Sequence, residues 1–205
     1  ALKFVRALDA DGTVWALPIS VESVGTVGEH VSLSMVNGNP AISFYSNSSD
    51  DLKYIRAIDI NGLTWGNSIS VDVTGSVGTY TSLHVINGNP AISYYDVTNT
   101  DLKYVRATDS DGTSWGTPLT LDATGSVGQF TSLANVNGFP AIAYFDVTNT
   151  NLKYLGTVDV DGSAWNAPVI LDGASNSVGQ YISLNVANGK AAVSYYSTSS
   201  SELKY

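Results

Sequence analysis

The sequence is 205 residues long and has 18 acidic against nine basic side chains, which gives a net charge of −9 at pH 7. Such a surface repels phosphate backbones and anionic lipids, so we expect no nucleic-acid partner and no membrane insertion. The chain has no cysteine, which excludes disulfides, thiolate catalysis and cysteine-ligated zinc. Charged residues make up only 13%, about half of the usual ~25%. Surface polarity must then come from Ser, Thr, Asn and Gly, a mix common in secreted β-proteins, and we expect an extracellular or cell-surface location.

One phrase of the sequence recurs along the whole chain at a nearly constant interval. The phrase is LKY, or LKF at its first occurrence, and it returns every 50 residues with one extra residue before the last copy. The extra residue falls in a Gly/Ser stretch, residues 173–179, where an insertion disturbs little. We expect a single domain, 1–205, made of repeats 1–50, 51–100, 101–150 and 151–201, with 202–205 starting a fifth copy. The copies start at Leu2, Leu52, Leu102, Leu152 and Leu203.

Each repeat contains four candidate strands separated by turn signals. In the third repeat the first strand is LKYVRATD (102–109), followed by an Asp/Gly turn, and the second runs from Trp115 to residue 123. A Gly-rich connection, GSVG, leads to the third strand, 130–138, which ends at an Asn-Gly hairpin signal. The fourth strand, 140–146, begins at a proline, which a first strand residue tolerates. No segment has a sustained helical period, so the class is all-β.

Four strands in about 50 residues, repeated in tandem, predict a β-propeller of four-stranded antiparallel blades. In this interpretation the GSVG segment opens the innermost strand, the PAISYYD-type strand is second, the LKY strand third and the Trp strand outermost. The chain would start and end in a third strand, so N- and C-terminal strands together would clasp a ring of four blades. Two alternatives stay open: a second copy completes a larger ring, as a homodimer, or the ring continues in a longer parent protein.

The turn between the third and outermost strands carries the same motif in every repeat, Asp-x-Asp/Asn-Gly-x-x-Trp, as in DSDGTSW at residues 109–115. This motif resembles the Asp-box, or BNR repeat, of sialidase-like propellers. The resemblance covers about nine residues per repeat, and this chain has one residue more between the Asp and the Gly, so it looks like a lengthened variant. In that family the box is structural, and the resemblance implies that each hairpin here is held by its Asp, Gly and Trp. The matching residues are Asp9, Asp11, Gly12 and Trp15; Asp59, Asn61, Gly62 and Trp65; Asp109, Asp111, Gly112 and Trp115; Asp159, Asp161, Gly162 and Trp165.

The Asp-x-Asp-Gly run also resembles the start of a calcium loop. Calcium requires six to eight oxygen ligands, usually with a distal carboxylate, and Thr113, Ser114 and Trp115 follow here instead. We therefore expect no metal and no other cofactor, with calcium as the weaker alternative.

The residues of a hydrolytic site are sparse in this sequence. Sialidase-like enzymes gather several arginines from different blades, whereas Arg6, Arg56 and Arg106 all occupy one repeat position, which is Gly156 in the fourth repeat. The structural interpretation is that each arginine supports its own blade by contact with a neighbouring carboxylate or aromatic ring. The two histidines, His30 and His84, have no partner at catalytic spacing. Because catalysis needs different groups around one atom, the near-identical repeats lead us to expect a protein that is not an enzyme.

Repeated aromatic residues instead suggest a ring of equal binding sites, as in propeller lectins, where weak sites add up to avidity. The competing interpretation of alternating aromatics is packing between sheets. We expect a multivalent binding module whose partner is a glycan or a protein surface. The alternatives are a structural scaffold module of a larger surface protein and, more distantly, a sialidase-like glycoside hydrolase. The ligand-binding candidates are Tyr45, Tyr95, Phe145 and Tyr196 with Asp96 and Asp146, and a neighbouring set of His30, Tyr80, Phe130 and Tyr181.

Overall fold

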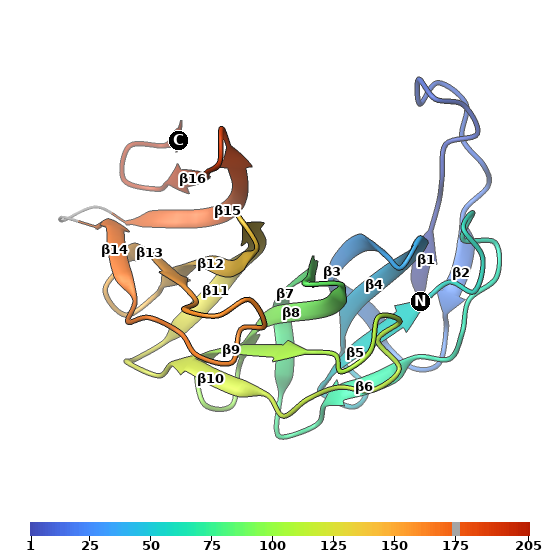
Figure 1. Ribbon diagram of the computed structural model, residues 1–205, viewed down its shortest axis with the longest axis horizontal. Helices are drawn as coiled ribbons and strands as arrows, with labels where there is room; N and C mark the ends of the chain where they lie inside the picture. The colour runs from blue at the N-terminus through green and yellow to red at the C-terminus, as the bar shows by residue number, and fades with distance from the viewer. Residues whose placement is uncertain (174–176) are drawn as a thin grey trace.

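The computed structural model describes residues 1–173 and 177–205, and all of its regular structure is β-strand. The strands form five antiparallel sheets that follow one another along an open arc (Figure 1). We number the sheets one to five in chain order. Sheet one contains β1 (Leu2–Phe4) and β2 (Ile19–Glu22); sheet two contains β3 (Val27–Val36), β4 (Asn39–Ser46), β5 (Asp51–Arg56) and β6 (Ile69–Asp72).

The next two sheets repeat the strand order of sheet two. Sheet three contains β7 (Val77–Ile86), β8 (Asn89–Asp96), β9 (Asp101–Arg106) and β10 (Leu119–Asp122). Sheet four contains β11 (Val127–Val136), β12 (Phe139–Asp146), β13 (Asn151–Gly156) and β14 (Val169–Asp172). Sheet five has three strands: β15 (Val178–Ala187), β16 (Lys190–Ser197) and β17 (Glu202–Lys204).

The predicted strand order within a blade is confirmed, from the GSVG strand through the second and LKY strands to the short strand after the Trp. The innermost strand begins at Val127, inside the GSVG segment that was predicted to open it. Gly128 lies within this strand; it has a φ of +109°, and a Cβ there would lie 2.7 Å from the Cα of Leu102. The glycine therefore makes a bulge inside the strand, where the sequence suggested a connecting loop. The one-residue insertion in 173–179 falls largely on residues 174–176, outside the described part of the chain.

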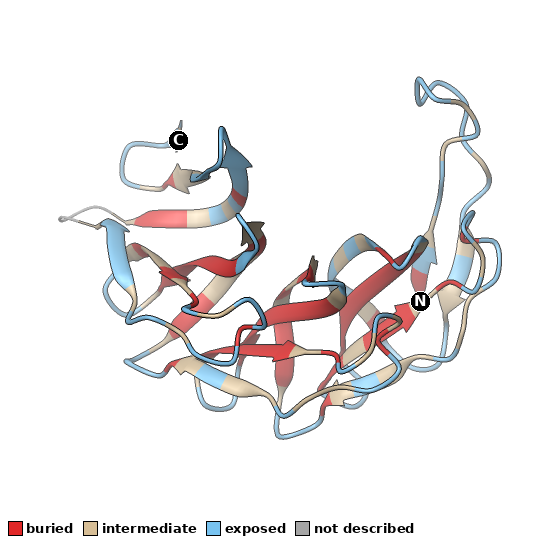
Figure 2. Ribbon diagram, viewed as in Figure 1, coloured by how far each residue is buried: buried red, intermediate tan, exposed pale blue. Residues whose placement is uncertain are grey.

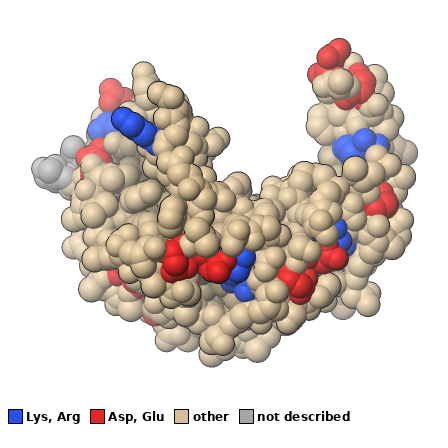
Figure 3. Space-filling view, viewed as in Figure 1, with Lys and Arg blue, Asp and Glu red and all other residues tan. Residues whose placement is uncertain are grey.

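The expected clasp between the two ends of the chain is not formed. In the described residues β1 pairs with β2 and β17 pairs with β16, and no hydrogen-bonded ladder joins sheet one to sheet five. The two sheets lie at opposite ends of the arc, with a hollow between them in the space-filling view (Figures 1 and 3). The reason is that β17 itself takes the third-strand place beside β16, where the clasp requires β1.

The core lies between neighbouring sheets, so most burial is in the middle of the arc (Figure 2). One apolar cluster joins sheets two and three through residues that include Leu52, Tyr54, Leu83 and Ile92, and an equivalent cluster joins sheets three and four. Each sheet thus buries its faces against its neighbours, which is the physical reason for tandem repetition.

Candidate functional site: an aromatic row on the inner strands

The inner strands of the last four sheets lie side by side and bring four aromatic residues into one row. Neighbouring inner strands are linked by hydrogen bonds such as that from the Leu83 amide to Ser32 Oγ, 3.0 Å, which recurs from the Leu133 amide to Ser82 Oγ at 3.0 Å. The row, which we call the aromatic row, has ring centroids 4.6 Å, 4.6 Å and 4.9 Å apart, and each pair is tilted. Its members are His30, Tyr80, Phe130 and Tyr181.

The backbone of the aromatic row is strained in the same way at every position. The φ angles of His30, Tyr80, Phe130 and Tyr181 are 49°, 52°, 53° and 51°, in the left-handed region that bulky residues rarely adopt. Each residue falls where the register with the second strand shifts, as between Gln129 and Ser132. The bulge turns the ring toward its neighbours in the row, where the rings line a shallow pocket of about 180 Å³.

The aromatic row is partly open to solvent, and its ionisable members respond to that burial. Tyr181 is 70% exposed and His30 is exposed, while Tyr80 and Phe130 are half-buried. Burial among the rings lowers the pKa of His30 and raises the pKa of Tyr80. Near pH 7 both side chains are therefore uncharged, and the row offers apolar ring faces with neutral polar tips.

The other predicted aromatic set lies beneath this row and is mostly buried. Tyr45, Tyr95 and Phe145 are at most 9% exposed, and each ring meets a row member edge-on at 6.3–6.4 Å. The Tyr45 hydroxyl donates to Asp50 Oδ1 at 2.5 Å, and Tyr95 is hydrogen-bonded with Ser126 Oγ at 3.0 Å. Tyr196 repeats the edge-on contact, against Tyr181. The structure thus brings both predicted sets together, with the mostly buried set of Tyr45, Tyr95, Phe145 and Tyr196 packed beneath the aromatic row.

The predicted ligand carboxylates, Asp96 and Asp146, are buried and take part in ion pairs. Asp146 lies 3.0 Å from Lys153 Nζ and accepts hydrogen bonds from the amide and side chain of Asn149. Asp96 lies 3.7 Å from Lys103 Nζ and has the same two contacts with Asn99. These contacts occupy the carboxylate oxygens within the sheets, so the groups hold a loop and a lysine in place.

The lysines belong to ionic clusters that the sequence analysis missed. Lys103 Nζ and the Tyr94 hydroxyl of sheet three both donate to Asp72 Oδ2 of sheet two, at 2.6 and 2.7 Å. Lys153 and Tyr144 make the same contacts with Asp122. The signal in the sequence was the recurrence of Lys and of a carboxylate at the interval of the repeat, as in Asp72 and Asp122.

The hairpins that resemble Asp-boxes, which we call Asp–Trp hairpins, are residues 9–15, 59–65, 109–115 and 159–165. In the third, Asp109 accepts hydrogen bonds from the amides of Asp111, Thr113 and Ser114, at 2.7–3.0 Å. The Trp115 indole donates to the Gly112 carbonyl at 2.9 Å. The Asp109 oxygens that a calcium ion would need are thus committed to backbone amides, and the described residues contain no cluster of three or more potential metal ligands.

Each interior Asp–Trp hairpin also packs on the third strand of the preceding sheet. Trp115 meets Tyr54 edge-on with centroids 5.2 Å apart, and the Tyr54 hydroxyl donates to the Asp111 carbonyl at 3.0 Å. Arg56 lies 3.3 Å from the Asp111 carboxylate while also donating to the Val36 and Asn37 carbonyls. The expectation that this arginine supports its blade against a neighbouring carboxylate is confirmed.

Comparison with protein-family models finds no match, and comparison with curated proteins finds none either. Among solved structures, a mutant of the NanB sialidase from Streptococcus pneumoniae superposes with a TM-score of 0.63 at 16% identity, covering 95% of this chain and 32% of that one. The GH62 α-L-arabinofuranosidase of Coprinopsis cinerea has a TM-score of 0.58 at 14% identity, covering 87% and 62%. An exo-β-1,3-galactanase from Phanerochaete chrysosporium has a TM-score of 0.59 at 12% identity, covering 84% and 44%.

These likenesses place the arc among sialidase-like β-propeller folds, and the chain spans between about a third and three fifths of the lengths of those proteins. They also correct one expectation. The sequence led us to expect a protein that is not an enzyme, but the similar structures are carbohydrate-cleaving enzymes, so the likeness points to a glycoside hydrolase fold. The described residues contain no helix that could cross a membrane.

Proposed function

We propose that the protein binds carbohydrate along the aromatic row, using the four rings as repeated, individually weak stacking sites. The observation that carries the proposal is the left-handed backbone at His30, Tyr80, Phe130 and Tyr181. Residues in this region cost on the order of 1–3 kcal/mol each and cluster at functional sites. The second aromatic set already fills the apolar space beneath the row, so packing alone gives little reason to repeat the strain in four strands.

The chemistry of the row favours a sugar over other ligands. A ring face carries the negative side of the aromatic quadrupole, and the C–H bonds of a sugar ring present positive hydrogens to it. The net charge of −9 disfavours anionic polymers, which makes a neutral glycan the better partner. Four stacking rings in one row add avidity. The carbohydrate-cleaving enzymes among the similar structures support the same class of ligand. The proposal also includes an extracellular location, and it takes each Asp–Trp hairpin to be a lengthened Asp-box.

Glycan-array binding of the purified chain tests the proposal. We expect binding to neutral oligosaccharides that weakens several-fold in Tyr80→Ala and Tyr181→Ala, because each substitution removes one stacking face. The matched control is Tyr205→Ala, which removes an aromatic ring that is fully exposed and distant from the row in sequence. Absence of binding across the array, or equal losses in all three variants, would contradict the proposal and favour a scaffold role.

Glycoside hydrolysis is a second candidate, favoured by the enzymes that share the fold. The row departs from repeat symmetry at its first end, where Glu29 and Asp50 flank Tyr45 and the equivalent of Glu29 is Thr79 in the next sheet. Paired carboxylates are what glycoside cleavage requires. We expect any cleavage of array-positive oligosaccharides, followed as new reducing ends, to be lost in Glu29→Gln; cleavage that persists in this variant would place the chemistry elsewhere.

A further inference from the structure

The two ends of the arc are complementary halves of one blade. Sheet one supplies the two outer strands of the four-strand order, and sheet five supplies the inner two with β17 beside them. The apolar surface that an inner hairpin covers elsewhere is therefore bare at sheet two, where Leu33 is 58% exposed while the equivalent Leu83 is 4% exposed. The surface that an outer hairpin covers elsewhere is bare at sheet four.

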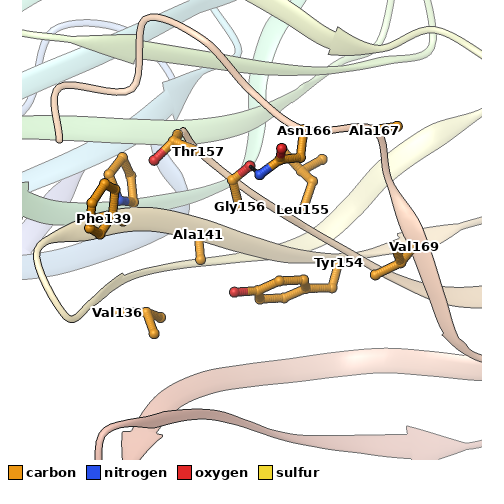
Figure 4. Close-up of a pocket in the computed structure, with 11 residues that line it drawn as sticks. Val136, Phe139, Ala141, Tyr154, Leu155, Gly156, Thr157, Asn166, Ala167 and Val169 are labelled. Carbon is orange, nitrogen blue, oxygen red and sulfur yellow. Dashed lines mark hydrogen bonds between the residues drawn. The ribbon is translucent and has the colours of Figure 1, made fainter. Parts of the chain in front are cut away.

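The bare surface at sheet four is a pocket of about 430 Å³ (Figure 4). Its lining includes Val136, Ala141, Tyr154 and Gly156. Tyr154 is the repeat equivalent of Tyr54 and Tyr104, and on both of those residues an Asp–Trp hairpin is seated. This pocket is therefore an acceptor for an Asp–Trp hairpin, which we call the vacant acceptor.

A free hairpin of the required kind is present at the other end of the chain. Trp15, in the hairpin 9–15, is 57% exposed, whereas Trp65, Trp115 and Trp165 pack edge-on against a ring at 5.0–5.2 Å. The hydrogen bond within the hairpin is present as in the other three, since the Trp15 indole donates to the Gly12 carbonyl at 2.8 Å. The hairpin thus has the shape of the three seated ones but no acceptor among the described residues.

The polar contacts of the vacant acceptor also match this hairpin. In the interior, the Asn37 side chain donates to Asp111 Oδ1 at 2.7 Å, and Asn87 does the same to Asp161 at 2.9 Å. The equivalent Asn137 has no such carboxylate and donates to the Gly189 carbonyl instead. Asp11 stands at the hairpin position of Asp111 and Asp161 and would give Asn137 the same partner.

We propose that the vacant acceptor binds the Asp–Trp hairpin 9–15 of a second copy of this chain, and that the exchange is mutual, so that two arcs close into one ring. The outer hairpin of each copy completes the inner hairpin of the other, which leaves neither end bare. The inference is independent of any carbohydrate ligand.

A second copy fits better than the hairpin of the same chain because the arc is held open by its own interior contacts. Bringing residues 1–22 onto Tyr154 of the same chain requires a tighter turn at every interface between sheets, including those fixed by the Asp72–Lys103 and Asp122–Lys153 ion pairs. Exchange with a second copy supplies the hairpin from a separate molecule, without drawing the two ends of one chain together. It only requires that β1 of the partner replace β17, whose Leu203 is 76% exposed where its equivalent Leu52 is fully buried.

Mass measurement of the 205-residue chain in solution tests the proposal. We expect a concentration-dependent species of two chains. Trp15→Ala removes the central ring of the contact and should weaken association by at least about tenfold. Val97→Ala is the matched control, because it removes an exposed apolar side chain directly after β8 in sheet three, between the two ends of the arc. A wild-type chain that stays single or forms larger open assemblies overturns the proposal, as does a folded Trp15→Ala variant that associates normally.

A gain of association guards against a variant that merely misfolds. Gly156 replaces the arginine that pairs with the hairpin carboxylate in the interior, so Gly156→Arg should add a pair with Asp11 and tighten association roughly threefold, the size of a partly exposed ion pair. Deleting residues 202–205 frees the place of β17 and should leave association equal or tighter. If the deletion abolishes the two-chain species, β1 does not take that place and the proposal is wrong.

Discussion

The interface between sheets one and two and the interface between sheets two and three are built alike but are held by different chemistry. In both, a Trp of the later sheet meets a third-strand ring edge-on: Phe4–Trp65 at 5.2 Å and 64°, Tyr54–Trp115 at 5.2 Å and 66°. The later interface adds the buried cluster around Asp72. The first has Glu22 at the position of Asp72, and Glu22 accepts from Ser68 and from backbone amides instead.

The two interfaces differ in their polar contacts but share the same contact between aromatic rings. The distance between the Trp ring and the third-strand ring is unchanged when the polar cluster is absent, so this aromatic contact does not depend on the cluster. The cluster of Lys103, Asp72 and Tyr94 then fixes which strand faces which, because its buried charges tolerate no other partner. Stability should therefore depend strongly on the cluster only where the charges are already buried.

The largest expected effect is the loss of the cluster's cation. Lys103→Met leaves the buried carboxylates of Asp72 and Asp96 without their ion pair, and we expect it to lower the free energy of unfolding by about 3–5 kcal/mol. Lys53→Met is the matched control at the first interface, where Lys53 has no ion pair among the described residues, and its loss should stay below about 1 kcal/mol. Urea unfolding measures both. Equal losses would contradict the distinction between the two interfaces.

A smaller effect on the free energy of unfolding is expected from removing the tyrosine hydroxyl at the later interface or adding one at the equivalent position of the first. Tyr94→Phe removes a buried donor to the Asp72 carboxylate and should cost about 1.5–3 kcal/mol. The reverse change, Phe44→Tyr, buries a hydroxyl where the Glu22 carboxylate already has other donors, and should cost about 1–3 kcal/mol. Thermal unfolding of the two variants measures this. Stabilisation by Phe44→Tyr would mean that Glu22 can turn and rebuild the cluster.

Much of this comparison could be predicted from the sequence, since the fifty-residue recurrence of LKY and the turn signals of each repeat predict the strand order within a complete sheet. The hairpin role of Asp109 and Trp115 was also predictable, because Asp and Gly in a tight turn have few other uses. The curvature of the arc was not. It depends on how far each ring contact tilts one sheet against the next, and a repeat pattern has no information on that angle.

The candidate site was predictable in its residue types but not in its layering. Both aromatic sets alternate in strands, and the sequence offers no reason to place Tyr80 in the open row and Tyr95 beneath it. The difference follows from the bulge at Gly78, where a Cβ would lie 2.7 Å from the Cα of Leu52. That bulge shifts the register before Ser82 and turns Tyr80 out of the sheet. Glycine in a strand indicates a bulge, but not which side chain it redirects.

Acid should weaken the interface between sheets two and three, which contains the ionic cluster around Asp72. The pH at which this happens depends on the groups that donate hydrogen bonds to the Asp72 carboxylate. Burial raises the pKa of Asp72, but the hydrogen bonds from Lys103 and Tyr94 outweigh it and hold the pKa below the ordinary value of 3.8. A lowered folded-state pKa contributes stability that is present above 3.8 and is lost as the pH falls through the folded value.

Removing one donor should bring this acid loss to a higher pH. We expect the Tyr94→Phe variant to begin losing stability nearer to pH 3.8 than the wild type, because fewer hydrogen bonds favour the carboxylate of Asp72. Unfolding free energies measured from pH 6 down to pH 2 would show it, with Phe44→Tyr, which leaves Asp72 untouched, as the control. A parallel decline in wild type and Tyr94→Phe would mean that other carboxylates determine the acid limit.

The smallest expected effect concerns the arginines at the end of the third strand. Arg106 donates to the Ile86 and Asn87 carbonyls at 3.1 Å and lies 3.2 Å from Asp161. Arg106→Lys keeps the charge but has no planar fork to reach both carbonyls and the carboxylate at once.

Because the Asp161 side chain is 54% exposed, we expect Arg106→Lys to lower the free energy of unfolding by only about 0.2–1 kcal/mol. Most of that loss should come from the carbonyl contacts, so it should persist at about 1 M salt, where the ion pair is screened. Arg6→Lys is the matched control, since Arg6 has no ion pair among the described residues. If the loss disappears in salt, the ion pair and not the carbonyl contacts is what the arginine adds to the interface.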